Sequence, residues 1–135
     1  MLIRRCIKIG KIYLSSYYTR NYNVPKEVTF INVARKDMVG INNKIIELAP
    51  SKELFDWYWK HKEESDWFDY YKKEYKRQII TNKATRKILI ELRDRILSGE
   101  DICLLCFCRK ANKCHRGLLG DMFKNYGIEI IDTDK

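Results

Sequence analysis

No stretch of this sequence is long and apolar enough to span a membrane. A spanning helix needs roughly 18 consecutive apolar residues, and the apolar runs here are far shorter. Residues 1–14 contain cations but lack a long apolar centre followed by a small-residue cleavage site, so no signal peptide is expected. We therefore predict a protein that has no membrane partner and lies in the cytoplasm.

Several familiar functional motifs are also missing. The chain contains no Walker loop, no GxGxxG and no HExxH. Cys103 and Arg109 have the Cys-x5-Arg spacing of cysteine phosphatases, but the residues between them lie inside a predicted strand instead of a glycine-rich loop. These absences exclude the common nucleotide-binding and zinc-protease loops, and no cofactor is predicted.

Internal repeats and low-complexity tracts are absent as well, and 135 residues suit a single domain, 1–135, with its own core. Charged residues make up 33% and apolar residues 45%, which is typical of a globular chain and not of a disordered one. Five cysteines form an odd number in a chain without predicted export, so reduced thiols are expected.

The periodicity of the apolar residues predicts an α/β domain. The segments that suit strands are 7–14, 28–33, 102–108 and 128–131. The segment 102–108 is apolar at every position and is expected to be covered on both sides, with Cys106 and Cys108 on one face and Cys103 on the other. The segments that suit helices are 51–60, 66–80, 83–97 and 115–126, with Ser51 and Ser65 as N-cap residues, and residues 19–27 suit a loop. Trp59 and Tyr126 are expected among the inward-facing residues of these helices. This order favours a Rossmann-like three-layer fold, with a mostly parallel sheet of about four to five strands and helices on both faces.

The positive charge is concentrated toward the N-terminus. The net charge is +9, and residues 1–51 contain nine cations against three anions. Such an excess favours polyanionic partners, either a nucleic acid or a phosphorylated small molecule. The alternative is a lysine-rich composition with solvated surface side chains.

Aromatic residues are dense in the segment 55–75, which contains three Trp, two Phe and four Tyr. They recur at helical spacing. We interpret them as core packing in preference to a base-stacking surface.

The candidate site lies where the predicted strands end. In parallel sheets, ligands bind beyond the carboxyl ends of the strands, and these ends fall at 15–18, 34–35 and 108–116. We therefore predict a ligand-binding pocket built from Arg116, Arg35, Ser15, Ser16, Tyr17, Cys106 and Cys108.

A predicted helix start supplies the anion-binding part of this pocket. Cys114, His115 and Arg116 occupy its first turn, where free backbone N–H groups and the helix dipole attract anions. Arg116 is predicted to clamp a phosphate or carboxylate through two hydrogen bonds. The alternative is a structural ion pair with Asp121 or Asp132.

Two residues of this turn are candidate catalytic groups. The ordinary pKa of His115, near 6.5, suits proton transfer. The helix start and the nearby cations Lys113 and Arg116 are expected to lower the pKa of the Cys114 thiol. Because Cys114 and His115 are adjacent in sequence, their side chains are expected to point in different directions.

The cysteines permit a second interpretation. One conceivable zinc-ligand set is Cys106, Cys108, Cys114 and His115. Because this set lacks the usual paired-knuckle spacing, and because adjacent residues such as Cys114 and His115 rarely both ligate one ion, no metal is predicted. For Cys6, Cys103 and Cys106, a role as small buried core residues is favoured at least as much as a functional one.

The segment 104–119 reads LLCFCRKANKCHRGLL. It is similar to the Leu-Leu-Cys … Cys-His-Arg signature of the domain-of-unknown-function family 488. LAPSKEL at 48–54, YKKEYKRQI at 71–79 and IYLSSYY at 12–18 are similar to its other segments. The resemblance implies a small α/β domain with a pocket built around Cys106, Cys114, His115 and Arg116.

The chain departs from the family pattern at Cys108, where many relatives have an acid. The segment after Arg35 is also a loose match. We expect the protein to recognise a phosphate, a nucleotide or a nucleic acid. Whether it also acts as an enzyme on such a substrate is left open. The alternatives are a non-catalytic nucleic-acid-binding module and a thiol or zinc protein.

Overall fold

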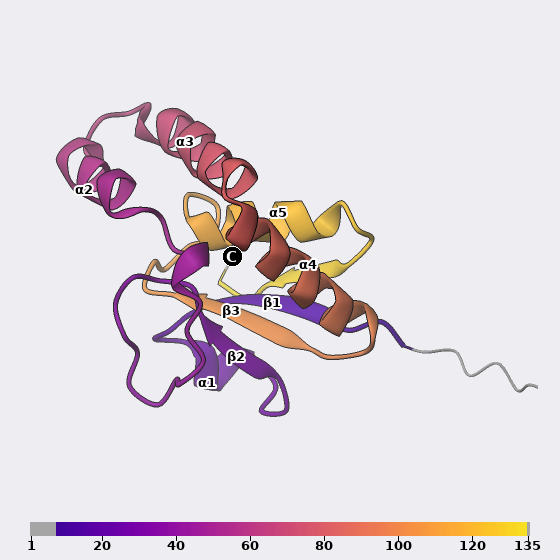
Figure 1. Cartoon of the computed structure of the whole chain (residues 1–135). Helices are drawn as coiled ribbons and strands as arrows, with labels where there is room; N and C mark the ends of the chain where they lie inside the picture. The colour runs from indigo at the N-terminus through magenta and orange to yellow at the C-terminus, as the bar shows by residue number, and fades with distance from the viewer. Residues whose placement is uncertain (1–7, 135) are drawn as a thin grey trace, which may run out of the picture.

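The computed structural model describes residues 8–134 (Figure 1). Its strands are β1 (Lys11–Ser16), β2 (Thr29–Asn32), β3 (Ile102–Cys106) and β4 (Glu129–Asp132). Its helices are α1 (Arg20–Asn23), α2 (Lys52–His61), α3 (Trp67–Thr81), α4 (Lys83–Leu97) and α5 (His115–Lys124), with a 3-10 turn at Ile46–Leu48. Cys6 and the first residue of the predicted strand 7–14 lie outside the described residues.

The four strands form one parallel sheet in the order β2-β3-β1-β4. This confirms the predicted α/β class and the parallel pairing. Ser16 at the end of β1 is the pairing partner of Cys106 at the end of β3, and Asn32 at the end of β2 pairs with Leu105. The carboxyl ends of these three strands therefore lie at the same edge of the sheet.

The strand order explains which helix lies on which face. The step from β1 to β2 runs across the sheet in the direction opposite to the steps from β2 to β3 and from β3 to β4. Since such crossovers are right-handed, α1 lies on one face, whereas α4 and α5 cover the other (Figure 1). The helices are on both faces, as predicted, although the first face has only the four residues of α1.

Two apolar clusters fill the space on the two sides of the sheet. The larger one includes Ile12, Leu14, Ile31, Leu104, Tyr75, Ile96, Leu119 and Phe123. The smaller one includes Val24, Val28, Met38, Cys103, Leu105, Cys106 and Cys114. All five residues of β3 are buried, which confirms the prediction of a strand covered on both sides.

Helix boundaries follow from capping groups. The Ser51 hydroxyl accepts a hydrogen bond from the Leu54 amide at the start of α2, as predicted. α4 has the predicted bounds 83–97, starts at an Asn82 side chain that caps Thr85, and ends before Gly99 with φ of 111°. The residues 8–134 include no helix with both the length and the apolarity needed to cross a bilayer.

Several local predictions were wrong. The predicted loop 19–27 contains the short helix α1. β3 ends at Cys106, so Cys108 lies in the following loop and not in the strand. Tyr126, predicted to be buried, is 49% exposed, and Trp59 is 55% exposed. Ser65 does not cap α3, whose first flanking residue is Asp66.

Glu100 connects the end of α4 to the start of β2. Its carboxylate accepts hydrogen bonds from Arg95 Nε at 2.9 Å and from Thr29 Oγ1 at 2.8 Å. The hydrogen bond from Arg95, followed by that from Thr29, lowers the pKa of Glu100. A lowered pKa in the folded state means that the carboxylate stabilises the fold above its unfolded-state pKa, and that this contribution is lost as the pH falls through the folded-state value.

Glu100→Gln is therefore expected to reduce stability at pH 7 by no more than about 1 kcal/mol, because the pair is largely solvent-screened. The difference in Tm between wild type and variant should become smaller as the pH falls from 7 to 3, because the carboxylate is progressively protonated. Thermal unfolding of both proteins at the two pH values measures this. An equal difference at both pH values would contradict an ionised-carboxylate contribution.

Candidate functional site

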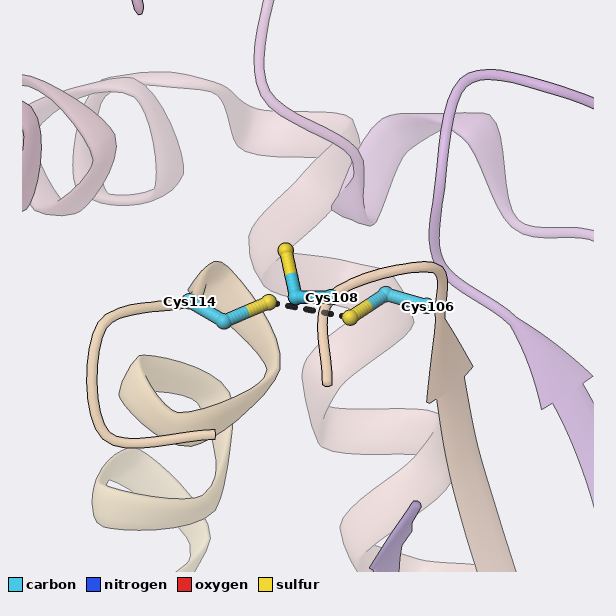
Figure 2. Close-up of side chains that lie close together, drawn as sticks. All are labelled: Cys106, Cys108 and Cys114. Atoms are coloured by element: carbon cyan, nitrogen blue, oxygen red, sulfur yellow. Dashed lines mark hydrogen bonds between the residues drawn. The ribbon is translucent and has the colours of Figure 1, made fainter. Parts of the chain in front are cut away.

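Three thiols meet at the connection between β3 and α5. Cys106 ends β3, Cys108 follows it in the loop, and Cys114 immediately precedes α5. The Sγ atoms of Cys106 and Cys114 are 2.9 Å apart, and the three sulfur atoms all lie within 4.8 Å of one another. Figure 2 shows the three side chains converging from the strand end and the helix start. We refer to Cys106, Cys108 and Cys114 as the sulfur cluster.

Backbone contacts bring the loop back to the strand. The Cys114 amide donates to the Ala111 carbonyl at 3.2 Å, and the Cys114 carbonyl accepts from the Gly117 amide at 3.0 Å. A Cβ atom at position 117 would overlap the Ala111 carbonyl. Residue 117 is therefore a glycine because the loop backbone occupies the space that a side chain would need.

Arg116 ties the same loop together from inside. Its side chain is fully buried, and its Nη1 donates to Cys106 Sγ at 2.7 Å and to the Cys108 carbonyl at 2.6 Å. Nη2 donates to the Arg109 carbonyl at 3.4 Å, whereas Nε has no hydrogen-bond partner among the described residues. The guanidinium thus forms its hydrogen bonds mainly with protein atoms of the loop.

The acid paired with Arg116 comes from the C-terminal end of the described chain. Asp134 Oδ2 lies 3.5 Å from Arg116 Nη2, and its side chain is 8% exposed. The same carboxylate accepts a hydrogen bond from the Ser16 amide. The structural partner is therefore Asp134 and not Asp121 or Asp132.

His115 is held in one tautomer. It is 5% exposed, and its Nε2 lies 2.6 Å from the Val33 carbonyl, so Nε2 carries the proton and donates it. Nδ1 is then free of a proton and lies 3.6 Å from Cys114 Sγ. The expectation that the two neighbouring side chains point apart is wrong, because the turn into α5 rotates them together. Burial lowers the pKa of His115 and keeps the ring neutral near pH 7.

The pKa values of the three thiols do not follow the prediction. Hydrogen bonds from Cys106 and then from Cys114 lower the pKa of Cys108 to about 3. Burial raises the pKa of Cys106 to about 12 and raises that of Cys114 as well. The prediction of a low pKa for Cys114 is wrong, because the helix start also buries this thiol completely, and Cys108 is the thiol of the cluster whose pKa is lowered.

A cavity of about 400 Å³ opens beside the sulfur cluster. Its predicted site residues are Arg35, Cys106, Cys108, Cys114 and His115. Its further lining residues are Tyr18, Ala34, Lys36, Pro50, Phe55, Tyr58, Trp59, Trp67, Tyr71, Phe107 and Lys113. Ser15, Ser16, Tyr17 and Arg116 do not line it.

The hydroxyl groups that were expected in the pocket are used by the backbone instead. Ser15 and Ser16 are 0% and 1% exposed, and the Ser15 hydroxyl donates to the Ser16 carbonyl. The Tyr17 hydroxyl donates to the Val39 carbonyl at 2.8 Å. The end of β1 is buried under the residues that follow β4, so these side chains face protein and not the cavity.

The aromatic side chains that line the cavity were not predicted as site residues, because the segment 55–75 was interpreted as core packing. That interpretation holds for Tyr71 and Tyr75, which are 5% and 0% exposed. In α2, whose residues are all described, Leu54 is the one fully buried side chain. The segment contains more aromatic residues than the inner faces of two short helices bury. This excess was the available indication that some of them line a cavity.

The family comparison covers most of the chain. A family model described as "Active DUF488-N3 subclade" (DUF488-N3a) matches residues 12–127. This range includes every residue that lines the cavity but ends before Asp134. No curated protein and no solved structure matches the chain. Because the matched range exceeds half of the chain and contains the Cys-His-Arg segment, the chain belongs to the DUF488 family.

Proposed function

We propose that the cavity beside the sulfur cluster binds a nucleotide, either free or as part of a nucleic-acid strand. The observation that carries this proposal is that aromatic side chains and cations line one and the same cavity. His115 and Cys114, which also line it, stay predictions as catalytic residues of an enzyme acting on such a substrate.

The aromatic part of the lining suits a base. Phe55, Trp59 and Trp67 come from α2 and α3, and Phe107 lies in the loop after β3. Aromatic side chains stack on bases with about 1–3 kcal/mol per base. A volume of about 400 Å³ also lies within the usual range of small-molecule cavities.

The cationic part of the lining suits a phosphate. Arg35, Lys36 and Lys113 lie at the same cavity. Arg35 Nη1 donates to the Pro50 carbonyl at 3.0 Å, which fixes the side chain while the remaining guanidinium N–H groups can bind an anion. The net charge of +9 adds a general attraction for polyanions.

A larger cavity supports the proposal less well. It has a volume of about 620 Å³ and lies between α2 and α3. Its described lining contains no thiol and no lysine, and its Arg77 already pairs with Glu74 at 3.1 Å. Neither the charge nor the reactive groups of the first cavity are present there.

Arg35→Ala is the test variant. Since a hydrogen bond to a charged group contributes about 1.5–3 kcal/mol, nucleotide affinity should fall at least about tenfold. Tryptophan fluorescence or calorimetric titration with the four ribonucleoside monophosphates and a short single-stranded oligonucleotide measures this. Arg86→Ala is the matched control, because Arg86 also donates from Nη1 to one backbone carbonyl, that of Ile80, and does not line the cavity.

A non-catalytic nucleic-acid-binding module would behave differently. Arg35→Ala and Arg86→Ala would then weaken oligonucleotide binding equally, and salt would weaken it steeply for all proteins. No binding of any nucleotide to the wild type would overturn the proposal itself. A reducing, cytoplasmic location is part of the same proposal, and the free thiols Cys103, Cys106, Cys108 and Cys114 support it.

A further inference from the structure

The sulfur cluster forms a donor set that ordinary core packing does not require. Cys106 and Cys114 are buried, but Cys108 is exposed and still directs its sulfur to within 4.8 Å of the other two. A cysteine that served only as a small apolar residue would gain nothing from this position. Cys103, which is buried three residues before Cys106 in β3, is an example of such a core cysteine.

The three sulfur atoms come from two rigid elements. Cys106 is fixed by the last pair of the β1–β3 ladder, and Cys114 by the start of α5. Figure 2 shows the Cys108 sulfur on the loop between them, above the line that joins the other two. A small movement of side chains would give three thiolates around one soft or borderline cation, a ligand type that suits zinc.

His115 is oriented as metal-binding histidines are. Such residues usually donate the N–H of the non-ligating nitrogen to a carboxylate or a backbone carbonyl, which fixes the tautomer. Here Nε2 donates to the Val33 carbonyl at 2.6 Å, and the unprotonated Nδ1 faces Cys114 Sγ at 3.6 Å. A fourth donor therefore lies next to the sulfur cluster.

The charges around the cluster favour a divalent cation. Three thiolates and one Zn²⁺ would leave a single negative charge, and the guanidinium of Arg116 lies beside it, with Nη1 2.7 Å from Cys106 Sγ and Nη2 paired with Asp134 at 3.5 Å. The buried guanidinium thus places a positive charge next to the sulfur atoms.

From these contacts we propose that Cys106, Cys108 and Cys114 bind Zn²⁺ as thiolates, with His115 Nδ1 as the fourth ligand. The thiol protons of Cys106 and Cys114 pass to solvent on binding, whereas the lowered pKa of Cys108 leaves this thiol already ionised, and no redox change is involved. Bound zinc would close the loop 107–114 at the inner end of the cavity. The inference does not depend on the proposed nucleotide binding, because metal affinity is measured without nucleotide.

The experiment uses the full chain, kept reduced with a phosphine. Zinc content is measured by elemental analysis after dialysis, and affinity by competition with a chromophoric chelator. Cobalt(II) replaces zinc as a spectroscopic probe, since thiolate coordination gives charge-transfer bands and tetrahedral geometry gives intense d–d bands. The expected result for the wild type is one zinc per chain and a thiolate-rich tetrahedral cobalt spectrum.

Cys108→Ser is the decisive variant, because Cys108 is exposed and its replacement leaves the core intact. Zinc affinity should fall at least about 100-fold, and His115→Ala should reduce it about 10-fold or more. Cys103→Ala is the matched control and should bind zinc as the wild type does. Circular dichroism shows that each variant is folded.

Three results would overturn the inference. They are a wild type that neither contains zinc nor competes with the chelator, a Cys108→Ser variant with unchanged affinity, and a Cys103→Ala variant that loses as much affinity as Cys108→Ser. Unchanged affinity in His115→Ala would overturn the assignment of the fourth ligand. Nucleotide titrations of the metal-free wild type separate failure of this inference from failure of the nucleotide proposal.

Discussion

Arg116→Met is expected to lower the free energy of unfolding by about 3–5 kcal/mol, because it removes one partner of a buried ion pair and leaves the other uncompensated. Arg116 is fully buried, and its partner Asp134 is 8% exposed. The variant also leaves the Cys108 carbonyl without its donor. Urea unfolding followed by circular dichroism gives the difference in free energy.

Arg109→Met is the matched control, since it makes the same substitution in the same loop at an exposed position. It should change stability by no more than about 0.5 kcal/mol. In the double variant Arg116→Met with Asp134→Asn, the loss should be smaller than the sum of the single losses, because the second change removes the uncompensated charge. A loss below about 1 kcal/mol in Arg116→Met would show that the ion pair does not hold the loop.

This expectation changes what a substitution of Arg116 can reveal. If Arg116 only clamped an anion, as the sequence predicted, its substitution would abolish anion binding and leave the fold intact. In the structure the guanidinium contacts Cys106, Cys108 and Asp134 and does not line the cavity. Loss of ligand binding in such a variant would therefore report the shape of the loop, whereas Arg35 tests the ligand contact directly.

The regular elements could be predicted because their apolar periodicity was strong. α4 has the predicted bounds, since Leu92 and Ile96 recur at helical spacing on its buried face and a glycine follows its end. α1 could not be predicted, because this four-residue helix buries none of its side chains and therefore shows no apolar pattern. An apolar pattern in the sequence reveals a helix only where that helix has a buried face, and this explains both outcomes.

The sequence could predict which residues meet at this edge of the sheet, but not the contacts between them. Strand ends in a parallel sheet meet at one edge whatever the side chains are, so Arg35, Cys106 and His115 were correctly brought to one region. The pairing of Arg116 with Asp134 depends on how the chain runs after β4. No spacing or periodicity in the sequence encodes that contact.

The thiols show the same limit at shorter range. Side-chain alternation placed Cys106 and Cys108 on one face of a strand, but the strand ends at Cys106. The apolar residue Phe107 continued the sequence pattern beyond the last backbone pair. The contact between Cys106 and Cys114 arises from the return of the loop, which the Gly117 position makes possible.

Gly117→Ala is expected to open this loop. The added Cβ would overlap the Ala111 carbonyl, a backbone atom that cannot rotate away, so the loop must shift. Despite the gain in helix propensity, we expect a net loss of about 1–3 kcal/mol in stability. Oxidation by diamide should link two thiols of the sulfur cluster rapidly in the wild type, because Cys108 supplies a thiolate and the three sulfur atoms lie within 4.8 Å of one another. The variant should form this disulfide at least about tenfold more slowly, because intramolecular rates depend on orientation.

Gly120→Ala separates the steric effect from the change in helix propensity. Both glycines lie in α5, and both substitutions gain the same propensity of about 1 kcal/mol. The Cβ at position 120 would meet Leu14 Cδ1 at 2.9 Å and Ile130 Cγ2 at 3.2 Å, which are ends of side chains that can turn aside. Its oxidation rate should therefore match that of the wild type. If Gly117→Ala kept both the stability and the rate of the wild type, the close approach of Ala111 would not be what holds the sulfur cluster together.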